Sequence, residues 1–416
     1  MSAPGWDEMW RVFGRIGMLS FGGPAAQIAL MHRELVERRP WLTEATYLRA
    51  LSLCMLLPGP EAMQLATYAG WKMRGVVGGL LAGLLFVLPG ALVIAVLAFG
   101  YLYAGDMPLV QAAFVGIKAA VIVVVFQALK KVAAKALHGL QGWLLALFSF
   151  VALFVFGLPF PLIVLLAGLW GFLSRNGTGD TPQVAVGDAR ANSIATVALW
   201  AALWALPLLL IWLTDQDFLL QLGLFFSKLA VVTFGGAYAV LAYMTQTVVQ
   251  EYGWITTEQM IDALGLAETT PGPLILVTEF VALLAGYAQA GVAGALAAGV
   301  LALWVTFTPC FLWIFLAGPY LDRISGQPRL AGALTAITAA VVGVIANLSL
   351  WFAIHVLFRE ILPTPTLAVP VPVWSSFDLG AGLLTVIGAI LMLGFKRGFV
   401  STMLILAALA LLLSGL

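Results

Sequence analysis

The sequence predicts an all-α polytopic membrane protein built from two inverted-topology repeats with broken or re-entrant helices. Three observations predict this class: few charged residues, recurring apolar runs, and a repeat at constant spacing. Of the 416 residues, 62% are hydrophobic and only 9% are charged, and the mean hydropathy is +1.04. A soluble domain carries roughly 25% charged residues, so this chain must turn most of its surface toward lipid.

Apolar runs of roughly 20 residues, the length at which a helix crosses a bilayer core, recur along the chain. Crossings are expected near 76–103, 110–129, 142–157, 160–173 and 194–213, and again near 289–318, 329–357, 376–395 and 399–415. Four more apolar segments, at 12–32, 46–70, 217–249 and 259–286, each fit either a re-entrant hairpin or a pair of short crossing helices.

An internal repeat relates the two halves. Phe21 corresponds to Phe234, and the Pro-Gly-Pro motif at 58–60 corresponds to the one at 271–273, each at a spacing of 213 residues. Further on, Pro89 corresponds to Pro309 at a spacing of 220, so we expect about seven inserted residues near Gly286–Gly294. The predicted domains are a first repeat at 1–173, a polar cytoplasmic linker at 174–193, and a second, inverted repeat with C-terminal helices at 194–416.

The distribution of cations predicts the inversion. Cytoplasmic loops near membrane segments collect Lys and Arg. The cationic loop positions are Arg33, Arg38, Arg39, Lys72 and Arg74 in the first copy, and Arg323 and Arg329 in the second. In each case the corresponding loop of the other copy has no cation, so corresponding loops are expected on opposite sides of the membrane. This places the N-terminus in the cytoplasm and the C-terminus in the periplasm of a bacterial inner membrane.

The four segments of open topology are each interrupted by Gly or Pro. The breaks are Gly22-Gly23-Pro24, Pro58-Gly59-Pro60, Gly235-Gly236 and Pro271-Gly272-Pro273. Proline breaks helices, and irregular backbone at membrane depth is tolerated only where protein buries it or water lines it. Glycine pairs also serve close helix packing, but interrupted helices at matching positions of two repeats point to a transporter binding site. Each new half-helix carries roughly half a positive charge at its N-terminus, so four of them, about +2 together, would suit a small dianion.

Polar residues near the breaks complete the predicted site. Lys118 lies mid-span, where a charge costs roughly 2.5–3.5 kcal/mol, and is expected to face a cavity or a partner. Glu61, Glu268 and Glu279 flank the Pro-Gly-Pro motifs and are the candidates for proton coupling, although Glu61 also suits the first turn of a helix through the dipole. The predicted substrate-binding residues are Gly22, Gly23, Pro24, Gly59, Pro60, Glu61, Gln64, Lys118, Gly235, Gly236, Thr269, Thr270 and Gly272.

The sequence offers no pattern for a cofactor, a metal or catalysis. The two cysteines and three histidines lack metal-ligand spacing, and no glycine-rich nucleotide motif follows a strand pattern. The polar residues form no nucleophile–base pair. We therefore predict that the chain is not an enzyme and binds no nucleic acid.

The segments "FGGPAAQIALMHRELVERRPWL", "LLPGPEAMQLATYAGW" and "LGLAETTPGPLILVTEF" resemble the long, two-domain members of the chromate ion transporter family. The resemblance implies an inner-membrane carrier that expels chromate and confers chromate resistance, with sulfate as a competitor. The expected partners are thus chromate, sulfate and membrane lipid, and a homodimer remains open. The second FGG motif has Ala237 where the first has Pro24, so the two breaks are expected to differ in shape.

Direction and coupling stay open at this stage. Alternatives are a sulfate or oxyanion importer, an anion channel or, in a different class, an integral-membrane enzyme acting on an oxyanion or a lipid phosphate. The membrane potential alone favours export of a dianion, whereas a site that binds proton and anion together would favour import.

Overall fold

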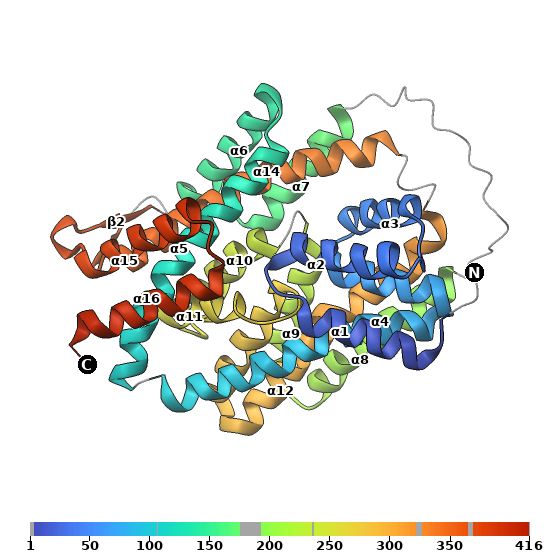
Figure 1. Cartoon of the computed structure of the whole chain (residues 1–416), viewed down its shortest axis with the longest axis horizontal. Helices are drawn as coiled ribbons and strands as arrows, with labels where there is room; N and C mark the ends of the chain where they lie inside the picture. The colour runs from blue at the N-terminus through green and yellow to red at the C-terminus, as the bar shows by residue number, and fades with distance from the viewer. Residues whose placement is uncertain are drawn as a thin grey trace. The chain divides into compact units, whose positions relative to one another are not determined.

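The computed structural model describes residues 4–105, 107–174, 193–234, 237–321, 327–364 and 369–415. Most of these residues are helical, and five helices are long and apolar enough to cross a membrane: α4, α5, α8, the stretch Leu274–Tyr320 and α14 (Figure 1). Shorter apolar helices accompany them, and the one sheet of the described residues has two three-residue strands. The prediction of an all-α polytopic membrane protein is confirmed.

The helices are α1 (Trp6–Leu19), α2 (Gly23–His32), η1 (Arg33–Arg38), α3 (Glu44–Leu56), α4 (Glu61–Ala104), α5 (Pro108–Ala136), α6 (Gly139–Phe154), α7 (Phe160–Ser174), α8 (Ser193–Leu213), α9 (Asp217–Val232), α10 (Ala237–Thr245), η2 (Gln246–Glu251), α11 (Thr257–Ala267), η3 (Leu274–Leu276), α12 (Val277–Ala317), η4 (Gly318–Tyr320), α14 (Pro328–Leu357), η5 (Trp374–Ser376), α15 (Leu379–Ala389), η6 (Ile390–Gly394) and α16 (Phe399–Ser414). Strands β1 (Ile361–Pro363) and β2 (Pro370–Pro372) pair antiparallel, with Leu362 opposite Val371.

The chain forms two compact units, each assembled from three separate stretches. Unit 1 comprises residues 1–96, 172–237 and 270–332, and unit 2 comprises 97–171, 238–269 and 333–416. Each unit therefore takes segments from both halves of the sequence. Residues 175–192, most of the predicted linker, lie outside the described residues.

Helices α4 and α12 are each two helices joined by a sharp reversal. The backbone leaves helical geometry at Arg74 and Gly75, and Gly75 has φ +64 and ψ −157. Gly70 and Gly78 then lie so close that a Cβ on either would overlap the other's carbonyl oxygen. The first arm of α4, which begins at Glu61, thus folds back against the second arm as a hairpin.

The same hairpin occurs in α12. Here Ala290 and Gly291 leave helical geometry, with Gly291 at φ +59 and ψ −147, and Gly286 lies against Gly294. These positions correspond to those of α4 at a spacing of 216 residues. Three of the inserted residues therefore precede the hairpin, where η3 forms an additional short turn, and the rest follow it. The expected insertion at Gly286–Gly294 is wrong, because this stretch is the reversal shared by both copies.

The helices beside the breaks are too short to cross a bilayer. Helices α1, α3, α9 and α11 have 14, 13, 16 and 11 residues, which at 1.5 Å per residue gives about 17–24 Å. A hydrocarbon core measures about 30 Å. These lengths agree with the short arms that both expected arrangements, a re-entrant hairpin and a pair of short helices, contain. The π-helices η1 and η2 follow the FGG arms at the same 213-residue spacing.

Unit 2 is organised around α5, which packs against α11, α15 and α16 (Figure 1). Gly116 of α5 touches the backbone of Leu406 on α16, and no other residue type leaves room there. Near the strand pair, Asp378 caps α15 through the Ala381 N–H at 3.0 Å and pairs with Arg359 at 2.8 Å. Partial burial raises the pKa of Asp378, but these hydrogen bonds and the nearby guanidinium outweigh it and leave the pKa below its usual value.

A Gly116→Ala substitution tests this packing. The new methyl group would overlap the Leu406 carbonyl, and overpacking of this kind costs about 1–3 kcal/mol. We expect a lower melting temperature of the detergent-purified protein. Gly14→Ala on α1 is the matched control, since no atom lies within 4 Å of its Cβ and alanine favours a helix by about 1 kcal/mol. Equal melting temperatures for the two variants would contradict the α5–α16 contact.

Candidate functional site

The helix breaks lie in pairs that join the two repeats. The N–H of Gly272 donates to the carbonyl of Ser20 at 2.9 Å, and the N–H of Gly59 donates to the carbonyl of Thr233 at 2.9 Å. Each Pro-Gly-Pro motif is thus bonded to the residue that precedes the FGG motif of the other copy. Both bonds lie within unit 1. Their reciprocity shows that the two copies are related by a pseudo-two-fold arrangement at the breaks.

The residues before the FGG motifs end their helices in the same way. The hydroxyl of Ser20 donates to Ile16 O at 2.6 Å, and that of Thr233 donates to Leu229 O at 2.6 Å. The hydroxyl satisfies a carbonyl that the ending helix would leave open. The main-chain carbonyl of each residue is then available to the Pro-Gly-Pro motif of the other repeat.

Left-handed backbone explains the glycines at the breaks. Gly22, Gly23, Gly59 and Gly272 have φ values of +83, +79, +119 and +89, a region that other residues adopt at a steric cost. A Cβ on Gly59 would lie 2.9 Å from Cys310 Sγ. At the FGG break, by contrast, a Cβ on Gly23 would meet no atom within 4 Å. The Pro-Gly-Pro breaks are therefore packed tightly, whereas the first FGG break opens onto free space.

Each Pro-Gly-Pro motif rests on the long helix of the other copy. Gly59 lies against Cys310 of α12, and Gly90 of α4 lies against the Pro271 carbonyl. Helices α4 and α12 also pack directly, since Gly83 lies against Phe311. The two motifs are consequently held on one pair of helices.

Two buried glutamines satisfy carbonyl groups at the breaks. Gln27 Nε2 donates to Ser20 O at 3.1 Å and to Gly272 O at 2.6 Å, and Gln64 Nε2 donates to Pro58 O at 2.7 Å. Both side-chain oxygens are buried and have no hydrogen-bond partner among the described residues. Gln64 was predicted as a site residue, whereas Gln27 was missed. A polar residue on an apolar half-helix, four positions after Gly23, was the available signal.

The carboxylates predicted for proton coupling have different surroundings. Glu61 begins α4 and is half-buried. Glu279, in the first turn of α12, is 4% exposed, and its Oε2 has no hydrogen-bond partner within the described chain. Glu268 belongs to unit 2, where it ends α11 and accepts a hydrogen bond from Tyr238 at 2.6 Å. An isolated buried carboxylate such as Glu279 is the kind of group that takes up and releases a proton during transport.

The threonines after α11 have separate environments. Thr269 donates to Leu266 O at 2.7 Å and so closes the end of the helix. Thr270 is buried at the start of the second Pro-Gly-Pro segment. Gly235 and Gly236, the second FGG glycines, lie outside the described residues, and Pro24 and Pro60 flank their breaks as predicted.

Lys118 has a partner that the sequence did not reveal. Its Nζ lies 3.6 Å from Asp262 Oδ1, and Tyr101 donates to Asp262 Oδ2 at 3.0 Å. Asp262 is 4% exposed on α11, and Lys118 is on α5. All three residues belong to unit 2. The predicted site residues therefore fall into two sets: the breaks with Glu61, Gln64, Thr270 and Glu279 in unit 1, and Lys118, Glu268 and Thr269 in unit 2.

No group of three or more metal-ligating side chains occurs in the part of the chain that the structure describes. Cys54 and Cys310 are buried and reduced. Apolar crossing helices, broken half-helices repeated at a fixed spacing, and buried ionisable groups are typical of a polytopic membrane transporter.

Comparison with protein families identifies the transporter family. The chain belongs to the chromate transporter family, whose profile matches residues 8–172 and again 220–414. The double match places one copy of the family unit in each half, in agreement with the repeat. No solved structure matches the chain.

Two named relatives match nearly the whole length of this chain, and a third matches about a third of it. The chain is 31% identical to the chromate transport protein of Cupriavidus metallidurans, over 92% of this chain and 87% of the relative. It is 32% identical to a probable chromate transport protein of Synechococcus elongatus, over 90% and 91%. An uncharacterized transporter of Bacillus subtilis, YwrB, is 30% identical over 36% of this chain and 76% of its own length.

A double-mutant cycle tests the Lys118–Asp262 pair. Removing one partner of a buried pair leaves an uncompensated charge, whereas removing both removes that penalty. We expect Lys118→Met and Asp262→Leu each to lower the free energy of unfolding, and the double variant to recover part of the loss, with a coupling of about 0.5–3 kcal/mol. Tyr101→Phe, which removes one hydrogen bond, is the control. Strictly additive effects would show that the two groups do not interact.

Proposed function

We propose that the chain exports chromate across the bacterial inner membrane by alternating access and so confers chromate resistance, with sulfate as a competing dianion. The observation that carries the proposal is the reciprocal bonding of the broken helices in unit 1. It joins each Pro-Gly-Pro motif to the residue before the other copy's FGG motif, which supports a shared anion site. The substrate comes from the relatives that are named as chromate transport proteins.

The proposed attraction for the anion is backbone polarity. The half-helices that begin at Gly23 and Glu61 each direct their N-terminus at a break, and such N-termini attract anions without a cationic side chain. Open space at Gly23 leaves room for a ligand beside one of these ends. The proposed site residues of unit 1 are Gly22, Gly23, Pro24, Gly59, Pro60, Glu61, Gln64, Thr270 and Gly272. The sequence pattern adds Gly235 and Gly236, which lie outside the described residues.

We propose that Lys118 binds the anion by releasing Asp262, its partner in the structure. In the structure its ammonium faces the Asp262 carboxylate at 3.6 Å, a long separation for an ion pair with hydrogen-bonding geometry. A loose partner can be replaced by a stronger anion at modest cost. We propose that Asp262 holds Lys118 when no anion is present, and that Glu268 and Thr269 provide further polar groups in the same unit.

The membrane potential supplies the driving force. A charge that crosses 100 mV gains roughly 2.3 kcal/mol, so a dianion gains about 4.6 kcal/mol on leaving an inside-negative cell. At about 1.4 kcal/mol per decade, this supports a gradient of roughly three decades. Export therefore needs no proton, and Glu61, Glu268 and Glu279 would add proton exchange only if they load as the anion leaves.

One observation favours a second candidate, a proton-coupled oxyanion importer. The buried, partnerless Oε2 of Glu279 would bind a proton together with an anion, and the two would then travel in the same direction. Linkage between the two ligands is reciprocal. The response of flux to voltage and to pH separates this importer from the exporter.

Chromate uptake into inside-out vesicles tests the exporter. We expect uptake to depend on the membrane potential, with accumulation falling by up to about three decades when 100 mV is collapsed. Collapse of the pH gradient alone should have a smaller effect. Total chromate in the vesicles and medium should stay constant, as transport without reduction requires. Uptake that ignores the potential and needs an opposite proton gradient would favour the importer, and unsaturable flux would indicate a channel.

Substitutions at the proposed site should lower transport. We expect Glu61→Gln, Glu279→Gln and Lys118→Ala each to lower chromate flux in proteoliposomes at least about tenfold, the effect of losing roughly 1.4 kcal/mol of coupling. Lys130→Ala, an exposed lysine on the same helix as Lys118, is the control. Wild-type rates for all three variants would remove these residues from the mechanism.

A further inference from the structure

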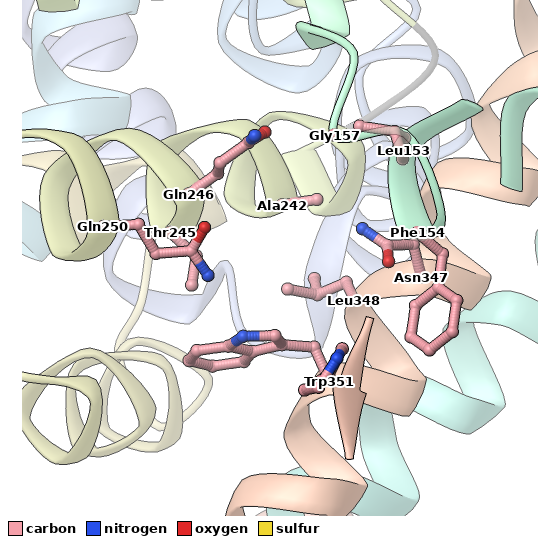
Figure 2. Close-up of a pocket in the computed structure, with 11 residues that line it drawn as sticks. Leu153, Phe154, Gly157, Ala242, Thr245, Gln246, Gln250, Asn347, Leu348 and Trp351 are labelled. Atoms are coloured by element: carbon pink, nitrogen blue, oxygen red, sulfur yellow. The ribbon is translucent and has the colours of Figure 1, made fainter. Parts of the chain in front are cut away.

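A polar pocket lies within unit 2. It is a pocket of about 60 Å³ formed by the end of α6, the π-helix η2 and the second half of α14 (Figure 2). The polar side chains of its lining are Thr245 at the end of α10, whose hydroxyl donates to Leu241 O at 2.8 Å, Gln246 and Gln250 on η2, and Asn347 and Trp351 on α14. All of its lining residues belong to the same unit.

The amide side chains of this pocket are uncommitted. Gln246, Gln250 and Asn347 make no side-chain hydrogen bond among the described residues. Figure 2 shows the Gln250 and Asn347 amides on opposite sides of the open space, with the Trp351 indole at its lower edge. Each amide offers two N–H donors and the indole one. Free donors that face a common space are suited to a ligand with several acceptor oxygens.

The rest of the lining limits what the pocket can hold. Leu153, Phe154 and Leu348 form apolar walls, and no charged side chain lines the space. The volume excludes a large solute. A small oxyanion satisfies the donors, but without a cation to offset its lost hydration it would bind weakly. Weak binding is the property needed where a transported ion leaves the protein.

The first repeat differs at the equivalent positions. Residues 213 positions before Gln246 and Gln250 are Arg33 and Glu37, on π-helix η1. There the acidic groups have partners: Glu37 binds His32 at 3.1 Å, and Glu34 binds Arg38 and Arg39 at 2.6 Å. The second copy keeps the π-helix but has amides in place of two charged residues, Gln246 for Arg33 and Gln250 for Glu37.

The predicted topology places the pocket on the extracytoplasmic side. Cation-poor loops predict that side for the segment around η2 and for the turn after α6, and the half of α14 distant from Arg329 faces the same way. All three walls of the pocket thus receive the same assignment.

We propose that this amide-lined pocket is a low-affinity oxyanion site on the extracytoplasmic face, where the exported dianion pauses before release. The proposal rests on the proposed export of chromate, but its central claim is the binding of a small oxyanion by Gln250, Gln246 and Asn347. It assigns a role to the stretch whose charges the second copy has lost. In this proposal the Arg-rich η1 segment of the first copy faces the cytoplasm, and the exported ion is released at the amide-lined pocket.

Thiol labelling tests the site without a transport assay. Both native cysteines are buried, so Gln250→Cys introduces an accessible thiol into the whole protein. We expect a membrane-impermeant maleimide added from the extracytoplasmic side to label it, and millimolar sulfate to slow labelling at least threefold. Gln246→Cys is a second variant with the same expected result. Gln216→Cys, an exposed amide position at the start of α9 outside the pocket, should label at the same rate with and without sulfate.

The outcomes separate this proposal from the proposed function. If sulfate slows the labelling of neither pocket cysteine, the pocket is filled by water only. This result would overturn the oxyanion site, whether or not the protein exports chromate. Labelling only from the cytoplasmic side would overturn its role in release. In inside-out vesicles, Gln250→Ala should raise the lumenal sulfate concentration that half-inhibits chromate uptake at least threefold and leave the KM on the cytoplasmic side unchanged. If Gln250→Ala leaves the half-inhibiting lumenal sulfate concentration unchanged, the result counts against the pocket. If the wild-type protein takes up no chromate at all, the result counts against the proposed function.

Discussion

The structure depends on the need to satisfy backbone N–H and C=O groups at membrane depth. Each unsatisfied group in hydrocarbon costs several kcal/mol, and a helix broken at mid-depth exposes several of them. Here each repeat supplies what the other lacks: Gly272 donates to Ser20, and Gly59 donates to Thr233. The breaks are therefore stable only in the presence of both copies. The remaining polarity, at the starts of the half-helices, is what the chain can offer to an anion.

The two copies keep this framework and differ in the side chains around it. Gln27 satisfies two carbonyls at one break pair, whereas its counterpart 213 residues later is Val240. The ionisable residues also differ between the copies, since neither Glu279 nor Asp262 has an acidic residue at the corresponding position of the first copy. Backbone hydrogen bonding supplies the symmetric part of the site, and side chains supply the difference between its two ends.

Much of the architecture could be predicted because the informative residues are rare and irreplaceable. Glycines at positive φ and Pro-Gly-Pro motifs appear in the sequence as themselves, and the expected crossing that starts near 76 matches the second arm of α4 after the reversal at Gly75. Partnerships between distant side chains carry no such signal. Asp262 lies in "TEQMIDALGLA", which reads as an ordinary capped amphipathic helix, so its contact with Lys118 could come only from the three-dimensional structure. The short strands β1 and β2 were missed for a related reason: each has three residues, below the length at which alternation is recognisable.

The crossed hydrogen bonds also constrain how the protein is made. Gly59 is synthesised more than 170 residues before Thr233, the carbonyl that receives its N–H. During insertion the first half must therefore wait in the bilayer, or beside the insertion machinery, with an incomplete break. Water or a chaperone has to cover that opening until the second half arrives. The break at Gly59 can therefore be completed only after the chain has been synthesised past Thr233.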